Sequence, residues 1–213
     1  MIILITRHGQ CISNLKKDYY FNCGIDDELT SLGKKQAKKT GECLAHENID
    51  VIFSSFSKRT AMTGEIIKSC LNNNPPMVFD KLLREAEFGI FDSKSIGYII
   101  KNYKKIYSER EKNKFSYKMP GGESYEEVYS RVIKFLLSLK EKYNGKTVLI
   151  VTHATTIKLF LLALSGMTLK KIESFYYYNT SIFKFEVSFF EKKLSSTKKK
   201  FNQKDHLFGI ENE

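Results

Sequence analysis

Two histidines each follow a short aliphatic run, and their positions suggest shared chemistry. The run Ile-Ile-Leu-Ile-Thr leads directly into Arg7 and His8, and the run Thr-Val-Leu-Ile-Val-Thr leads into His153. Continuous aliphatic runs of this length predict strands covered on both faces, as in a parallel sheet. Such sheets bind their ligands beyond the carboxyl ends of the strands. We therefore expect His8 and His153 to meet at one site, although they lie far apart in the sequence.

Charged side chains after the other predicted strands complete a set suited to a phosphoryl group. Arg59 stands in the first turn of a predicted helix, soon after the predicted strand 51–53. A helix N-terminus that carries an arginine favours a phosphate. The segment after a third predicted strand, 77–79, adds the carboxylates Glu85 and Glu87. Two arginines, two histidines and a carboxylate at strand ends predict a phosphoryl pocket with an acid beside it.

Strands and helices alternate between these residues. This alternation predicts an α/β fold: a single three-layer domain with a mostly parallel central sheet and helices on both faces. Thr30 and Ser57 precede two of the helices and are predicted N-caps. The predicted helices cover 30–46, 58–70, 125–143 and 155–164, and the last predicted edge strand covers 181–189.

The chain divides into one domain and a tail. Its 213 residues fit a single α/β domain, which we place at 1–190. Within it, about 91–120 is polar and lysine-rich, contains an amphipathic helical stretch near 96–107, and is expected to form a small helical insertion over the site. Residues 191–213 form a basic polar tail that we expect to be poorly ordered.

The net charge of +11 lies largely in two stretches, 94–118 and 192–204. Nucleic-acid motifs do not accompany them, so we expect attraction of small anionic substrates and no specific nucleic-acid binding. No apolar run approaches the roughly 18 residues of a membrane span. The N-terminal apolar stretch is too short for a signal peptide and lacks a basic lead-in. We therefore expect a cytoplasmic protein without membrane attachment.

The cysteines show no Cys-x-x-Cys pair and no metal-ligand spacing with histidine, which predicts thiols and no metal site. We hypothesise that positive charge at the phosphate site lowers the pKa of Cys11. The remaining histidines, His46 and His206, are expected to be solvated. The run from Tyr176 to Tyr178 is expected to serve packing and surface.

Six short motifs occur in one order along residues 3 to about 185, and together they resemble the histidine phosphatase superfamily, also called phosphoglycerate mutase-like. Each motif alone is weak, but six in register are highly specific. Arg-His-Gly-x-x-x-x-Asn is met by Arg7, His8, Gly9 and Asn14; Leu-Thr-x-x-Gly-x-x-Gln-Ala by Leu29, Thr30, Gly33, Gln36 and Ala37; Ser-Ser-x-x-x-Arg-x-x-x-Thr by Ser54, Ser55, Arg59 and Thr63; Leu-x-Glu-x-x-Phe-Gly by Leu83, Glu85, Phe88 and Gly89; Pro-Gly-Gly-Glu-Ser by residues 120–124; and Thr-His by Thr152 and His153.

The resemblance implies a two-step reaction that uses no metal or other cofactor. In the first step neutral His8 attacks phosphorus and forms a phosphohistidine, which divides one difficult displacement into two easier ones. An imidazole with an ordinary pKa of about 6.5 is substantially neutral at physiological pH, which agrees with this role. Arg7, Arg59 and His153 are expected to hold the equatorial oxygens and to stabilise their charge in the transition state.

The remaining site residues follow from the same motifs. Glu85 is expected to protonate the leaving oxygen and then to deprotonate the incoming water, and the motif register favours it over Glu87. Asn14 and the backbone around Gly122 are expected to help hold phosphate or substrate. Glu123 is expected either to contact substrate or to cap the following helix.

The resemblance favours the phosphatase branch of the family. Mutases of the family tend to have Glu-Arg at the acid and a longer insertion, and usually lack Pro-Gly-Gly-Glu-Ser, whereas here Ala86 follows Glu85. We therefore predict a metal-independent phosphomonoester hydrolase with a small phosphorylated substrate. A phosphoglycerate mutase and a catalytically idle phospho-ligand binding protein are the alternatives.

Several features leave the substrate open. Asp92-Ser93 stands where the family often has Glu-Gly, which bears on the loop beside the acid. Sugar phosphates, ribazole phosphate, phosphoglycolytic acids and phosphoproteins all remain candidate substrates. The resemblance also suggests a homodimer.

Overall fold

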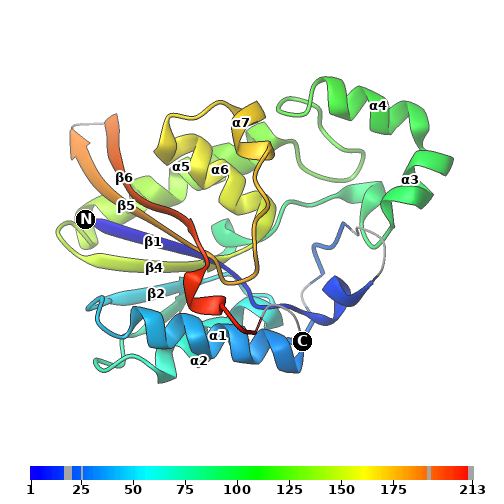
Figure 1. Cartoon of the computed structure of the whole chain (residues 1–213). Helices are drawn as coiled ribbons and strands as arrows, with labels where there is room; N and C mark the ends of the chain where they lie inside the picture. The colour runs from blue at the N-terminus through cyan, green and yellow to red at the C-terminus, as the bar shows by residue number, and fades with distance from the viewer. Residues whose placement is uncertain (17–20, 25, 191–192, 211–213) are drawn as a thin grey trace.

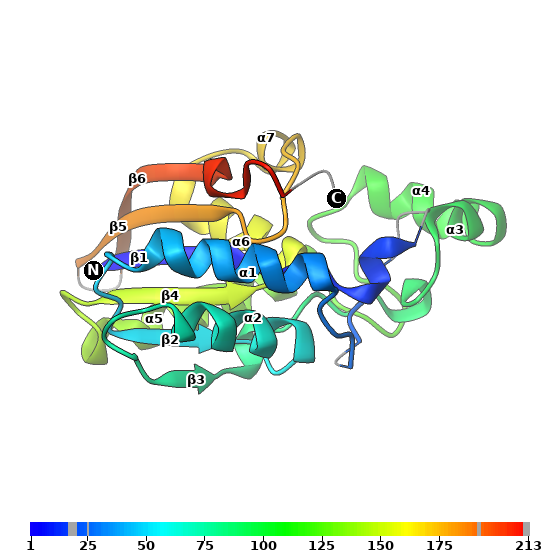
Figure 2. The same ribbon diagram turned by 60° about the horizontal axis from the view of Figure 1, so that its bottom comes forward.

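A mixed, mostly parallel sheet forms the centre of the computed structural model, which describes residues 1–16, 21–24, 26–190 and 193–210. Its strand order is β3-β2-β4-β1-β5-β6 (Figure 2). The first four strands in this order run parallel, and β5 and β6 are joined to them by antiparallel pairing. The predicted α/β class is confirmed. The strands are β1 (Ile2–Arg7), β2 (Val51–Ser54), β3 (Met77–Phe79), β4 (Thr147–Thr152), β5 (Ile182–Phe190) and β6 (Lys193–Gln203).

Helices cover both faces of the sheet, as Figure 1 shows. Helices α1 (Ser31–Leu44) and α2 (Lys58–Ser69) lie on one face, and α5 (Tyr125–Lys142) and α6 (Ala154–Ser165) lie on the other, with α7 (Leu169–Glu173) beside α6. No described helix is long and apolar enough to cross a membrane.

Alternate residues of the four inner strands pack into two separate cores, one on each face of the sheet. In β1, Leu4 packs with α1 and α2, whereas Ile3 and Ile5 pack with α5 and α6. All three side chains are almost completely buried, and each such burial contributes about 1.5–3 kcal/mol. Strands buried on both faces therefore need the continuous aliphatic runs seen in the sequence.

The N-termini of two helices show how local sequence sets their boundaries. Helix α5 begins with a reciprocal capping box, in which Ser124 Oγ accepts from Glu127 N and Glu127 Oε2 accepts from Ser124 N. Ser57 stands at the N-cap of α2, but its hydroxyl pairs with Thr60 Oγ1 at 2.9 Å and caps no backbone N–H. The predicted N-cap position of Ser57 is therefore confirmed, but its side chain makes no capping hydrogen bond.

The predicted insertion holds two short helices, α3 (Ile96–Asn102) and α4 (Lys104–Lys112), which project beside the sheet (Figure 1). The helical stretch expected near 96–107 is broken at Tyr103, whose backbone φ of −131° and ψ of 31° leave the helical region. Buried Arg110 anchors α4, because its guanidinium lies 5.5 Å from the ring centroids of both Phe21 and Tyr125.

The loop at the start of this insertion has Asp92-Ser93 where the family often has Glu-Gly. Asp92 Oδ1 accepts a hydrogen bond from Cys23 N at 2.9 Å, and Ser93 N donates to Phe21 O at 2.8 Å. Ser93 has a φ of +58°, a left-handed conformation in which glycine is less strained. The loop therefore keeps a glycine-like turn without the glycine.

The C-terminal residues differ from the expected poorly ordered tail. Residues 193–203 form β6, which pairs with β5, so β5 is not the edge strand that the sequence predicted. Beyond β6, Leu207 is buried and His206 Nε2 lies 3.0 Å from Thr40 Oγ1, so His206 is not simply solvated. Backbone pairing supports β6, which explains why its polar sequence gave no strand signal. Residues 191–192 and 211–213 lie outside the described residues.

Two glycines bring α1 against the strand end that carries His8. A Cβ on Gly33 would lie 2.0 Å from Gln10 O, and a Cβ on Gly9 would lie 2.5 Å from Gly33 O. The confirmed cap Thr30 fixes this start of α1, because its Oγ1 accepts from Gly33 N at 3.0 Å. Only residues without a side chain permit this approach.

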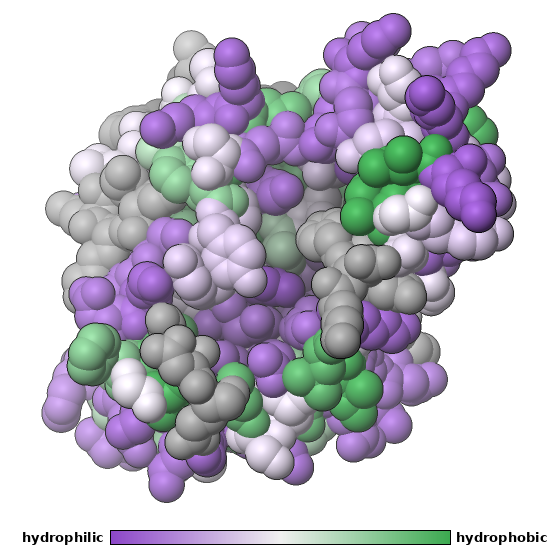
Figure 3. All heavy atoms as spheres, turned by 45° about the vertical axis from the view of Figure 1, so that its right-hand side comes forward, coloured by the Kyte–Doolittle hydropathy of each residue, from purple (hydrophilic) through white to green (hydrophobic). Residues whose placement is uncertain are grey.

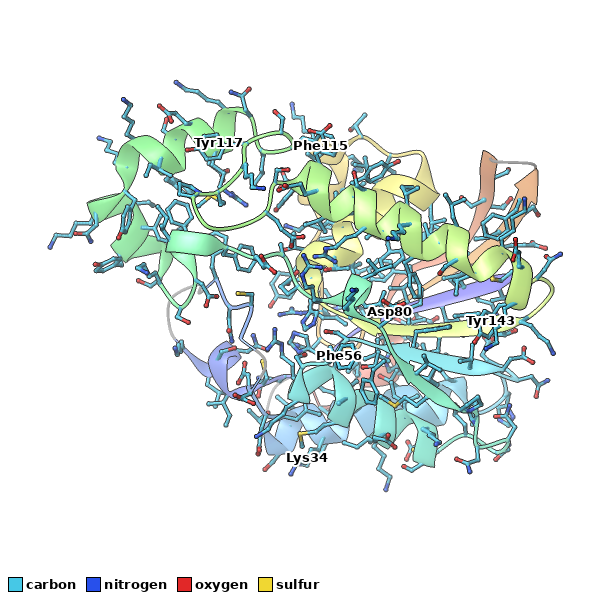
Figure 4. The ribbon with its side chains drawn as sticks, turned by 180° about the vertical axis from the view of Figure 1, so that it is seen from behind. Lys34, Phe56, Asp80, Phe115, Tyr117 and Tyr143 are labelled. Atoms are coloured by element: carbon cyan, nitrogen blue, oxygen red, sulfur yellow. The ribbon has the colours of Figure 1, made fainter. Side chains whose placement is uncertain are left out.

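We expect Gly33→Ala to lower the free energy of unfolding by about 1–3 kcal/mol, because the added methyl group meets backbone that has no room to yield. Urea denaturation measures the change. Lys34→Ala is the matched control: Lys34 is exposed on α1 (Figure 4), where substitutions usually change stability by less than about 0.5 kcal/mol. Equal unfolding midpoints for the two variants would contradict the close contact.

Candidate active site

The register between β1 and β4 brings the two predicted histidines together. Arg7 pairs with Thr152, and His8 N donates to Thr152 O at 3.0 Å, immediately beyond the last paired residues. The ring centroids of His8 and His153 lie 5.4 Å apart. The expected meeting of these residues at one site is confirmed.

The His8 ring is held in one tautomer. Its Nδ1 lies 2.8 Å from Gly9 O, and because a carbonyl only accepts, Nδ1 carries the proton and Nε2 carries the lone pair. The ring is buried. Burial, and then the nearby charges of Arg7 and Arg59, hold the pKa of His8 well below its ordinary value. His8 is therefore neutral, with Nε2 as its basic nitrogen.

His153 occupies the N-cap position of α6 and is buried. Burial contributes most to holding its pKa well below the ordinary value, followed by the charge of Arg59. Its Nε2 lies 3.5 Å from Ser57 Oγ. Both histidines of the site are thus kept neutral by the same two physical causes.

Backbone carbonyls orient the two predicted arginines. Arg7 Nη1 donates to Tyr177 O at 2.7 Å. Arg59 is buried in the first turn of α2, and its guanidinium donates to Gly24 O at 2.5 Å and to Asn22 O at 3.4 Å. Carbonyl groups orient a guanidinium without neutralising its charge, so the positive charge of both arginines remains available to an anion.

The carboxylate of Glu85 is held at the N-terminus of α6. Its Oε1 accepts from Ala86 N at 2.9 Å and from Thr156 N at 3.2 Å, and its Oε2 accepts from Thr155 N at 3.2 Å. Thr155 N and Thr156 N are backbone donors of the first turn of α6, which have no partner within the helix, whereas Ala86 N belongs to the loop beside Glu85. Thr155 and Thr156 were missed by the sequence reasoning, although their place two and three residues after His153 could have indicated them.

A buried arginine holds the backbone that carries this carboxylate. Arg131 donates to Leu82 O at 2.6 Å and to Glu85 O at 3.2 Å. It also pairs with Glu123, with Nε 3.1 Å from Oε1, and Glu123 in turn pairs with Arg84 Nη2 at 2.6 Å. Glu123 therefore neither caps α5, which its neighbour does, nor lines the cavity described below.

Gly122 and Glu87 also lie away from the reacting groups. A Cβ on Gly122 would lie 2.4 Å from Glu87 O, so the Gly-Gly turn packs against the segment after Glu85. Gly122 N donates to Met119 O at 2.8 Å, so it is not presented to a ligand. The exposed Glu87 carboxylate pairs with Arg84 at 3.2 Å, which leaves Glu85 as the carboxylate at the cavity.

Most of the predicted site residues, including Asn14, line a cavity of about 390 Å³. Figure 3 views the molecule from the side of the insertion, where mainly hydrophilic atoms surround a hollow. His153 lies beside His8 but does not line the cavity. The lining residues are Arg7, His8, Gln10, Cys11, Ser13, Asn14, Lys16, Asn22, Arg59, Glu85, Phe88, Ala154, Tyr176 and Asn179.

Cys11 lines this cavity, but the hypothesis of a lowered pKa is wrong. Burial, followed by a hydrogen bond with Asp27, raises the pKa of Cys11 to about 11, and the opposing charge of Arg59 is a smaller influence. Cys11 is therefore a neutral thiol. In the described part of the chain, no group of three or more histidine, cysteine or acidic residues could hold a metal ion.

Fold and site together define an α/β protein with paired neutral histidines and an arginine-rich pocket for an anion. Residues 3–198 match the family model of the histidine phosphatase superfamily (branch 1). The chain belongs to this superfamily, which confirms the resemblance found in the motifs.

Relatives of the chain include phosphatases and mutases. It is 30% identical over 151 residues to phosphoserine phosphatase 1 of Hydrogenobacter thermophilus, with 71% of each protein covered. It is 26% identical over 178 residues to the 2,3-bisphosphoglycerate-dependent phosphoglycerate mutase of Methylorubrum extorquens, covering 81% of this chain and 83% of that protein. A solved structure of phosphoserine phosphatase in complex with 3-phosphoglyceric acid, from Entamoeba histolytica, superimposes with a TM-score of 0.76 at 26% identity, covering 97% of this chain and 98% of that one.

The neutral state of the two histidines predicts how the free energy of unfolding depends on pH. His8 and His153 have lowered pKa values in the folded chain, whereas the unfolded chain takes up protons near pH 6.5. Their contribution to stability is therefore complete above that pH and is lost as the pH falls below it. The slope approaches about 1.4 kcal/mol per pH unit for each histidine.

Urea denaturation between pH 7 and pH 5 measures this slope. A double variant, His8→Gln with His153→Gln, should show a flatter dependence of the free energy of unfolding on pH. Most carboxyl groups titrate below this window, so they contribute little to the comparison. An unchanged slope in the double variant would show that the histidines are not held neutral.

Proposed function

We propose that this chain is a metal-independent phosphomonoester hydrolase that works through a phosphohistidine on His8. The fixed His8 tautomer carries the proposal: Nδ1 is bonded to Gly9 O, so the lone pair of Nε2 is available beside Arg7, Arg59 and Glu85. A neutral imidazole is a nucleophile, whereas an imidazolium is not. Membership of the histidine phosphatase superfamily supports this chemistry.

In the first step the His8 Nε2–phosphorus bond forms as the bond from phosphorus to the leaving oxygen breaks. Arg7 and Arg59 would stabilise the charge on the equatorial oxygens, with His153 beside them, because charge-assisted donors are strongest where the charge develops. Glu85 would give its proton to the leaving oxygen. The donors of the α6 N-terminus and the brace from Arg131 hold Glu85 in place for this transfer.

In the second step water attacks the phosphohistidine. Glu85, now ionised, takes a proton from the water as the new oxygen–phosphorus bond forms. The Nε2–phosphorus bond breaks, His8 returns to its neutral state, and inorganic phosphate leaves. The cycle consumes one water and requires no other reactant.

Two features support hydrolysis over mutation. Ala86 follows the acid, where the mutases of the family tend to have arginine, and the chain carries Pro-Gly-Gly-Glu-Ser. Relatives of both activities exist, and the phosphoserine phosphatase is the more similar of the two by identity. An idle phospho-ligand binder would need to lack a reacting group, whereas His8, Arg7, Arg59, Glu85 and His153 are all present. A small phosphorylated molecule fits the cavity as substrate.

The substitution of His8 by alanine should abolish hydrolysis of a panel of phosphorylated metabolites, measured as phosphate release in the presence of EDTA. The parent chain should turn over with or without the chelator. Binding of phosphate without any turnover would favour the idle binder. Transfer that needs a bisphosphate activator would favour the mutase.

Glu85→Gln should slow the hydrolysis of alkyl phosphates by about 10²–10⁴-fold. The hydrolysis of aryl phosphates with good leaving groups should slow much less, because only a poor leaving group needs the acid. The ratio of kcat/KM for the two substrate types measures the effect. Glu87→Gln is the matched control, because it makes the same carboxyl-to-amide change at an exposed position nearby. It should leave this ratio unchanged. Equal losses on both substrate types would remove Glu85 from the role of acid.

A further inference from the structure

One aromatic ring at the cavity has no part in the chemistry described so far. Tyr176 follows α7, lines the cavity and is 67% exposed, whereas Tyr177 beside it is 5% exposed and packs in the core. Interpreting this tyrosine run as packing and surface therefore accounts for Tyr177 but leaves the cavity position of Tyr176 unexplained. An exposed aromatic face at a ligand cavity offers stacking to a planar group.

The C-terminal strand fixes the position of this ring. Asn202 Nδ2 donates to Tyr176 O at 2.9 Å. The ring of Tyr176 meets the ring of Tyr178 edge to face, with centroids 4.6 Å apart. The Tyr178 ring also contacts Lys204, whose Nζ lies 3.9 Å from the ring centroid. Because its backbone and its aromatic neighbour are both held, Tyr176 loses little freedom when a ligand binds.

The same segment is also tied to the groups that would bind phosphate. Arg7 Nη1 donates to the carbonyl of Tyr177, and Thr180 N donates to Arg7 O at 3.1 Å. Asn179 Nδ2 donates to His8 O at 2.9 Å. The segment that follows Tyr176 is therefore hydrogen-bonded directly to Arg7 and His8.

We propose that Tyr176 forms a subsite that stacks on an aromatic or heteroaromatic ring in the leaving group of the substrate. The cavity of about 390 Å³ has room for more than a phosphoryl group, and Phe88 and Ala154 add apolar surface to its lining. The proposal relies on the proposed function only for the position at which the phosphoryl group binds. We expect the protein to prefer aryl or heteroaryl phosphomonoesters to the phosphates of small polar acids.

Binding to a His8→Ala chain tests this subsite without any turnover. The dissociation constants of 1-naphthyl phosphate and O-phosphoserine are measured by calorimetry in that background, with and without a change at Tyr176. Tyr176→Ala should weaken 1-naphthyl phosphate by about three- to tenfold and leave O-phosphoserine unchanged. Tyr176→Phe keeps the ring and should retain tight binding. Tyr98→Ala is the matched control, because Tyr98 is 49% exposed on α3 and does not line the cavity.

The subsite would be overturned if Tyr176→Ala weakened both ligands equally or neither of them. It would also be overturned if 1-naphthyl phosphate did not bind at all. Loss of 1-naphthyl phosphate binding in Tyr98→Ala would overturn it too. If the ring dependence holds but the parent chain releases no phosphate from any monoester, the proposed hydrolase fails while the subsite stands.

Discussion

The parallel pairing of β1 with β4 is the constraint on which the rest of the site depends. Its register places Arg7 opposite Thr152, so the next residue of each strand, His8 and His153, must lie side by side. The same sheet edge receives Arg59 from the start of α2 and Glu85 from the loop after β3. A one-residue shift of either strand would turn the side chains of that strand to the opposite face and separate the histidines.

Burial and positive charge then give these residues their chemical state. The sheet edge removes both imidazoles from water, and nearby arginines oppose a further positive charge, so both pKa values fall. The arginines themselves are held by carbonyl oxygens, which orient them but leave their charge for a ligand. The neutral state of the two imidazoles and the uncompensated charge of the two arginines therefore both follow from one arrangement.

Glu85 is positioned by contacts with the backbone of α6 and with Arg131. The N-terminus of α6 holds the Glu85 carboxylate, and Arg131 holds the carbonyl of the same residue. Glu123 balances the buried charge of Arg131, because an unpaired buried guanidinium would be costly. The Pro-Gly-Gly-Glu-Ser motif thus supports the segment that carries Glu85, through the Glu123–Arg131 pair and the close packing of Gly122 on the Glu87 backbone.

The sequence by itself determined the α/β class, the main helices and most of the predicted residues that line the cavity, because strand periodicity, Thr30 capping and motif order can be read along the chain. Tertiary structure decided what depends on contacts between distant residues. It assigned Glu123 and Gly122 to support, raised the pKa of Cys11 where the nearby positive charge suggested the opposite, and folded 193–203 into β6. It also placed Tyr176 at the cavity and buried Tyr177. A residue type sets which bonds a side chain can make, but burial and partners from other elements set which of them it does make.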